Sequence, residues 1–220
     1  MKLGYCPIGN GDSINPFDEI FSDAQDISVH GIAGCDAVVF WGGTDVHPSF
    51  YGEKPHRRNQ AQYERPSPRD TFERKAMLAC ITNDIPMIGV CRGAQLMCAV
   101  AGGSIIQDVT DHGFTHGIIT EEGEVLPTTS AHHQMMNPWN VPHKLLAWAS
   151  KNHSRHYQNG LHLEVPEMKQ HPEPEIIYFP RIRGLAIQGH PEWVPNDSPF
   201  AKLCNKFVMQ YLFSDIVTEA

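Results

Sequence analysis

The sequence has no apolar run that approaches the roughly 20 residues needed to span a bilayer, and its amino-terminal stretch is too polar for a secretory leader. We therefore expect a cytoplasmic protein without a membrane partner. A long basic run is also missing, the nearest being His56-Arg57-Arg58, and the formal net charge is −8. Nucleic-acid binding needs a concentrated positive field, so a nucleic-acid partner is disfavoured.

A disulfide framework is not expected either, because none of the six cysteines forms a CxxC pair and such scaffolds are usually smaller and richer in cysteine. Five of the six lie in apolar or helical settings and are read as small hydrophobic residues, with Cys91 as the exception. Repeats, low-complexity tracts and linkers are lacking as well. The 220 residues are therefore predicted to form a single domain, 1–220.

Short apolar runs alternate with helical patterns along the chain. Strands are predicted at 1–6, 36–41, 85–90 and 184–189, with short strands near 105–106 and 125–126 and a hairpin made of 161–165 and 176–179. Helices are predicted at 70–82, with Asp70 as the cap and Glu73 completing a capping box, at 92–101, and from 199 to about 212 after the cap Ser198. This alternation predicts a three-layer α/β domain with a mostly parallel central sheet and helices on both faces.

The segment Gly89-Val90-Cys91-Arg92-Gly93 lies between a predicted buried strand and a predicted helix. Small residues two positions before and after a nucleophile permit a sharp strand-to-helix turn, which places the side chain at the carboxyl edge of the sheet. The amino end of the helix favours a thiolate there. Cys91 is therefore the candidate nucleophile.

A thiol needs a base at neutral pH, because its unperturbed pKa is about 8.5. His190 directly follows the last predicted strand and so lies at the same sheet edge, although only the fold can bring it to Cys91. Glu192 lies two residues further on and is the candidate that orients the imidazole. The backbone N–H of Arg92 and the Gly42-Gly43 loop are candidates for an oxyanion hole.

Five stretches support a more specific interpretation: 42–48 (GGTDVHP), 69–73 (RDTFE), 89–109 (GVCRGAQLMCAVAGGSIIQDV), 131–134 (AHHQ) and 188–192 (QGHPE). Together they resemble the class I glutamine amidotransferase superfamily, and within it the branch of γ-glutamyl hydrolases and γ-glutamyl-amide hydrolases. The resemblance covers 36–140 and 176–213, whereas 150–183 and the residues before 36 depart from the family pattern. It implies a flavodoxin-like fold.

The resemblance also implies an activity and its residues. The expected reaction is cleavage of the γ-glutamyl amide of glutamine or of a γ-glutamyl amine through a thioester, with a small-molecule substrate and no cofactor. The implied catalytic residues are Cys91, His190 and Glu192, and the oxyanion donors are Gly43 and Arg92. The implied substrate-binding residues are Gly42, Gln95, His132, His133 and Gln134.

Three other interpretations remain open. The chain is alternatively a glutaminase subunit that passes ammonia to a synthetase partner, or a binding module without activity on this fold. The third is metal binding by His112 and His116 or by His132 and His133. Glycines beside His112 and His116 indicate a loop, whereas the HxxxH spacing suits zinc only on a helix. His132 and His133 are adjacent and would point in opposite directions on a strand, so no metal is expected.

Overall fold

The protein is described from a computed structural model, in residues 1–7, 16–61, 64–160 and 163–214. The strands are β1 Lys2–Tyr5, β2 Asp23–Asp26, β3 Ala37–Phe40, β4 Met87–Val90, β5 Ser104–Ile106, β6 Asp108–Val109, β7 His116–Thr120, β8 Val125–Thr128, β9 Met135–Asn137, β10 Lys144–Ala149, β11 Tyr157–Asn159, β12 Leu163–Glu164, β13 Pro174–Phe179 and β14 Gly184–Ile187. The α-helices are α1 Ile27–His30, α2 Pro68–Thr82, α3 Arg92–Val100 and α4 Pro199–Leu212.

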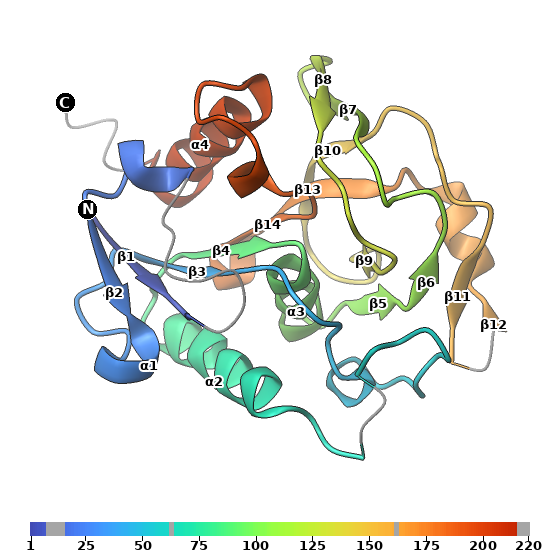
Figure 1. The fold of residues 1–220 in the computed structure, drawn as a ribbon, viewed down its shortest axis with the longest axis horizontal. Helices are drawn as coiled ribbons and strands as arrows, with labels where there is room; N and C mark the ends of the chain where they lie inside the picture. Colours follow the sequence, from blue (N-terminus) through green and yellow to red (C-terminus); the bar gives the residue numbers. More distant parts are fainter. Residues whose placement is uncertain (8–15, 62–63, 161–162, 215–220) are drawn as a thin grey trace.

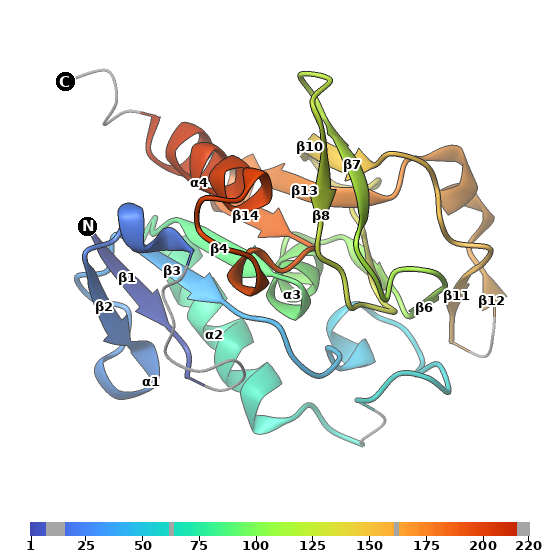
Figure 2. The same cartoon turned by 45° about the horizontal axis from the view of Figure 1, so that its top comes forward.

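The central sheet has the strand order β2-β1-β3-β4-β14-β13-β10-β7-β8. Its strands are parallel from β2 to β14 and antiparallel from β14 to β8. Two small sheets, β12-β11-β6 and β5-β9, lie beside the antiparallel half. Figures 1 and 2 show α4 on one side of the sheet and α2 and α3 on the other, which confirms the predicted three-layer α/β fold.

The alternation of side chains along the central strands creates two cores. Val39, Ile88 and Leu185 point toward α4 and pack with its apolar stripe. The neighbouring Val38 and Ala186 point the other way, toward residues of α2 and α3. Because both faces of these strands are covered, their sequences are apolar without alternation, as expected for a buried parallel sheet.

Two local predictions are wrong. The cap of α2 is Ser67, not Asp70: the Ser67 hydroxyl accepts from the Asp70 N–H at 3.0 Å, and the Asp70 carboxylate accepts from the Ser67 N–H at 3.1 Å. Pro68 at the first helical position favours this earlier start. Asp70 therefore takes the third helical position that the sequence reading assigned to Glu73.

The predicted hairpin of 161–165 with 176–179 is also wrong. Leu163–Glu164 pairs with β11 in a small sheet, while β13 lies in the central sheet between β10 and β14; residues 161–162 lie outside the described residues. Backbone pairing over this distance depends on tertiary packing, which the local pattern does not report. In the part of the chain that is described, no helix combines the length and the apolarity that crossing a membrane requires.

Candidate active site

Cys91 lies in the tight turn between β4 and α3, at the carboxyl edge of the parallel strands. Its φ of 50° and ψ of −106° lie outside the regions that ordinary side chains prefer. Glycines make room for the turn: a Cβ on Gly93 would overlap the carbonyl oxygen of Phe40, and a Cβ on Gly89 would lie 2.7 Å from the oxygen of Gly93. The sharp strand-to-helix turn that the sequence predicts is therefore present.

His190 follows β14 and is brought to the same edge of the sheet. Its Nδ1 lies 2.8 Å from Oε1 of Glu192, and the Cys91 side chain is close enough to the ring to raise its pKa. The indole of Trp193 stacks on the imidazole, with the ring centroids 3.6 Å apart. The hydroxyl of Thr129 donates to the His190 carbonyl at 2.7 Å and accepts from the His190 N–H at 3.2 Å.

These contacts set the charge of the imidazole. Burial by itself lowers the pKa of His190, but hydrogen bonds with Cys91 and Glu192, together with the charges of both groups, outweigh burial and raise this pKa to about 9. The imidazole is therefore protonated at neutral pH. A positive charge beside the sulfur favours the thiolate over the thiol.

The loop after β3 passes between Arg69 and His190. The Arg69 guanidinium donates to the carbonyl oxygens of Trp41 and Gly42, each at 2.9 Å. Gly43 has a φ of +146°, and a Cβ at this position would overlap the same guanidinium. A Cβ on Gly42 would lie 3.0 Å from Cε1 of His190. The positive φ of Gly43 and the tight space at Gly42 favour glycine at both positions, and the loop lies close against the histidine.

A buried cluster of charged side chains on α2 and α3 packs next to this loop. The Arg92 side chain turns away from the Cys91 cavity and forms ion pairs with Asp70 and Glu73 of α2. Arg69 also bonds to Glu73, with Nε 2.9 Å from Oε1. Only the backbone of Arg92 is therefore available at the turn, since its guanidinium ties α3 to α2. Breaking a buried pair by removing one partner usually costs about 3–5 kcal/mol.

A cavity of about 80 Å³ opens beside Cys91. It is lined by Gly43, Asp45, Gln60, Cys91, Gln95, Ala131, His132, His133 and Gln134. The fold thus brings together most of the residues that the family resemblance implied, while Gly42 lies on the His190 side of the loop.

Polar contacts organise the wall of this cavity. Gln95 Nε2 donates to the carbonyl of Gln134 at 3.0 Å. His133 Nε2 lies 3.0 Å from Oδ2 of Asp45, and this hydrogen bond raises the pKa of His133 in spite of its burial. Asp45 also accepts from the Gln60 N–H at 2.8 Å. His133 thus points across the cavity, toward the loop after β3.

Several lining and positioning residues were missed by the sequence reading: Asp45, Gln60, Ala131, Thr129 and Trp193. Asp45 and Ala131 lie inside two of the family-like stretches, 42–48 and 131–134, so their place in these motifs could have indicated that they line the site. No sequence motif marks Gln60 or Thr129, because these residues reach the site only through tertiary contacts.

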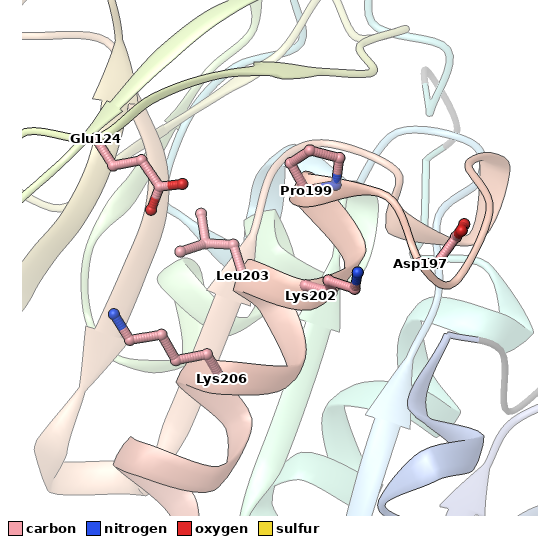
Figure 3. A pocket seen from close by; sticks show the side chains of 6 residues that line it. All are labelled: Glu124, Asp197, Pro199, Lys202, Leu203 and Lys206. Atoms are coloured by element: carbon pink, nitrogen blue, oxygen red, sulfur yellow. The ribbon is translucent and has the colours of Figure 1, made fainter.

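Among the described residues, one group has the composition of a metal site. His112, His132 and Glu175 are buried and gather their side chains at one place. A separate surface hollow lies along α4 and is lined by Glu124, Asp197, Pro199, Lys202, Leu203 and Lys206 (Figure 3). This hollow contains none of the residues described above and is therefore not part of the candidate active site.

The chain is similar in sequence to known glutamine amidotransferase-like proteins and similar in fold to solved glutamine amidotransferase structures. Over 76 residues the chain is 43% identical to the "Putative glutamine amidotransferase-like protein YvdE homolog" of Lactococcus lactis subsp. cremoris, an alignment that covers 34% of this chain and only 38% of that relative. A glutamine amidotransferase from Thermotoga maritima has the same fold, with a TM-score of 0.58 at 14% identity over 100% of this chain and 84% of its own.

The glutaminase domain of Trypanosoma brucei CTPS, solved with bound acivicin, also shares the fold, with a TM-score of 0.58 at 12% identity over 95% of this chain and 92% of that domain. The family model described as Peptidase C26 matches residues 20–164, a span that includes Cys91 and ends before His190. That span is more than half of the 220 residues and confirms the resemblance to class I glutamine amidotransferases, so the chain belongs to the Peptidase C26 family.

Proposed function

We propose that this protein is a cysteine-dependent amidohydrolase that cleaves the γ-glutamyl amide bond of glutamine or of a γ-glutamyl amine. The observation that carries the proposal is the contact of Cys91, in its sharp turn, with a buried imidazole that is itself bonded to Glu192. The family membership and the names of the relatives support the same chemistry. The three groups have the order of roles of a catalytic triad.

In the proposed reaction, the proton of the Cys91 thiol already lies on His190, and the thiolate sulfur bonds to the γ-carbonyl carbon. The carbonyl π electrons move to oxygen and form a tetrahedral oxyanion. When this intermediate collapses, the C–N bond breaks, and His190 protonates the departing nitrogen as ammonia or an amine. His190, now neutral, takes a proton from a water molecule, whose oxygen bonds to the thioester carbonyl carbon. The C–S bond then breaks, which releases the γ-carboxylic acid, ionised in water to the carboxylate, and restores the thiolate and the protonated imidazole.

The N–H groups of Gly43 and Arg92 are the proposed donors to the oxyanion. Two features support this assignment: the amide of Arg92 follows the nucleophile at the start of α3, and the loop carrying Gly43 is held in place by Arg69. Donors that are fixed before the reaction lose little free energy to reorganisation. Gly42, Gln95, His132, His133 and Gln134 are the proposed substrate contacts.

Replacing Cys91 tests the reaction directly. Cys91→Ala should lower kcat/KM for glutamine or a γ-glutamyl amine by about a thousandfold or more, because the members of a triad act as a unit. The matched control is Cys35→Ala, since Cys35 is also a buried free thiol but lies outside the candidate active site. A Cys91→Ala protein with full turnover would disprove the proposed nucleophile.

The alternative function is that of a glutaminase subunit with a synthetase partner. Trp193 favours this option, because its indole is 53% exposed at the edge of the site while stacked on His190. Exposed aromatic side chains are common in protein interfaces. The isolated chain should turn over γ-glutamyl amines if it acts alone, whereas a subunit should hydrolyse glutamine very slowly until its partner is added.

A further inference from the structure

A second polar cluster adjoins the Cys91 cavity and shares only His132 with the residues proposed above to contact the substrate. It consists of His112, in the loop between β6 and β7, His132, in the loop between β8 and β9, and Glu175 of β13. All three side chains are buried, and one ligand atom from each lies within 4.8 Å of those of the other two. The three segments are on the antiparallel side of the molecule (Figure 2).

In His132, one ring nitrogen has a partner and the other has none. Nδ1 lies 2.7 Å from the carbonyl oxygen of Gln134, to which it can only donate, so the hydrogen is assigned to Nδ1. Nε2 then carries a lone pair, and this buried atom finds no hydrogen-bond partner among the described residues. Metal-binding histidines have this arrangement, because a partner of one nitrogen orients the other toward the ion.

Glu175 repeats the pattern with its two carboxylate oxygens. Oε1 accepts from Nε2 of His116 at 2.8 Å. Oε2 is buried and has no hydrogen-bond partner in the described part of the chain. His116 therefore holds the carboxylate in place while leaving one oxygen available.

His112 completes the set. Its Nε2 lies 3.1 Å from Oε2 of Glu173, within ion-pair distance of this buried carboxylate but without the geometry of a hydrogen bond. Its Nδ1 is 3.9 Å from Oε1 of Glu175, beyond hydrogen-bond distance, and has no other partner among the residues described. The negative charge of Glu173 beside Nε2 favours the tautomer that carries its hydrogen on Nε2, and in that tautomer Nδ1 presents a lone pair.

Three buried acceptors therefore converge without a donor. Buried polar atoms without partners cost free energy and are rare in native proteins. One water molecule has two hydrogens and cannot satisfy three acceptors, whereas a cation can. The charge balance supports this choice, because Glu173 and Glu175 are both buried and neither forms an ion pair with a Lys or Arg among the described residues.

We propose that Nδ1 of His112, Nε2 of His132 and Oε2 of Glu175 bind one divalent cation, and that zinc fits this donor set best. Two imidazoles and a carboxylate are ligands that zinc prefers, with a fourth position open to water. Tetrahedral zinc requires neighbouring ligand atoms about 3.4 Å apart, so ligand atoms that lie up to 4.8 Å apart would move closer together when the ion binds.

The ion would link β13 to the loop that contains His132. The same histidine lines the Cys91 cavity, so the metal holds one wall of that cavity in position. It contacts none of the proposed reacting atoms, and its role is structural. The site differs from the HxxxH interpretation of the sequence, because His116 supports a ligand instead of binding the ion.

Metal content of the untagged full-length protein tests the proposal. After expression with added zinc and dialysis, elemental analysis should find about one zinc per chain. His132→Ala and Glu175→Gln should lower this content to background, whereas the control His143→Ala should keep it, because His143 belongs to a different contact, with Trp139. A wild-type protein without stoichiometric metal, or a Glu175→Gln protein that keeps its full content, would overturn the proposal.

Cobalt titration provides a readout that does not depend on how the protein was expressed. Metal-free wild-type protein, with its folding checked by near-ultraviolet circular dichroism, should bind one equivalent of Co²⁺ and develop the visible absorption of a tetrahedral site. His116→Ala should weaken this binding by about 10- to 100-fold, since it removes only the outer partner of Glu175. A folded wild-type protein that develops no such absorption would refute the site.

Discussion

At the scale of single residues, the protonation state of His190 governs the candidate active site. Its pKa is raised to about 9, because hydrogen bonds with Cys91 and Glu192 overcome the effect of burial. A raised folded-state pKa also stabilises the fold: this contribution is fully present below about pH 6.5 and is lost as the pH rises through about 9.

The pH dependence of the reaction should reflect the raised pKa of His190. We expect kcat/KM to fall on the alkaline side with an apparent pKa of about 9, as His190 loses the proton that the leaving amine needs. Glu192→Gln removes a negative charge from the imidazole and should shift this limb to lower pH. A pH–rate profile of both proteins with one γ-glutamyl amine provides the measurement, and an unchanged alkaline limb in the variant would contradict the assigned role of Glu192.

At the scale of secondary-structure elements, the turn from β4 into α3 depends on two glycines. Gly93, the second residue of α3, lies directly against β3, where a side chain would overlap the carbonyl of Phe40. The same packing brings the amino end of α3 close to the strand ends, where Cys91 and His190 meet. The Gly-Val-Cys-Arg-Gly motif of residues 89–93 thus provides both the glycines that the turn needs and the thiol of the candidate nucleophile.

Gly93→Ala should therefore destabilise the protein by about 1–3 kcal/mol, the usual cost of overpacking a well-packed interior. The free energy of unfolding in urea measures the effect. Gly113→Ala is the matched control, because a Cβ there meets nothing within 4 Å and its φ is not positive; it should change the stability by less than about 0.5 kcal/mol. Equal stabilities of the two variants would refute the packing argument.

At the scale of the whole molecule, the candidate active site lies where the two halves of the central sheet meet. Cys91 and His190 follow parallel strands, whereas Thr129 and the lining residues 131–134 follow β8 at the antiparallel edge. The two hydrogen bonds between the Thr129 side chain and the His190 backbone connect these halves directly.

Thr129→Val tests this connection, since valine has the shape of threonine but cannot form the two side-chain hydrogen bonds to His190. Each lost hydrogen bond should cost about 1 kcal/mol of stability, and the less firmly held imidazole should lower kcat with little change in KM. Steady-state kinetics together with urea denaturation separates the two effects. A variant with wild-type kcat would show that Thr129 does not position His190.

Much of the fold follows from the sequence because its signals are local. The apolar segments with glycines on either side of Cys91 predicted β4, the turn and α3, and the apolar stripe predicted α4, since each pattern reflects contacts among residues close in the chain. The glutamine amidotransferase-like family was likewise readable from short motifs, because those motifs encode backbone geometry as well as chemistry.

Only the tertiary structure decided which distant residues meet. It placed His190 against Cys91, paired β12 with β11 instead of β13, and gathered His112, His132 and Glu175 from three separate segments. Strand pairing and side-chain clusters of this kind depend on the packing of the whole chain, where each contact is stabilised by many others. A sequence pattern therefore specified the elements and the turn, while the packing of the whole chain determined the partners at the site.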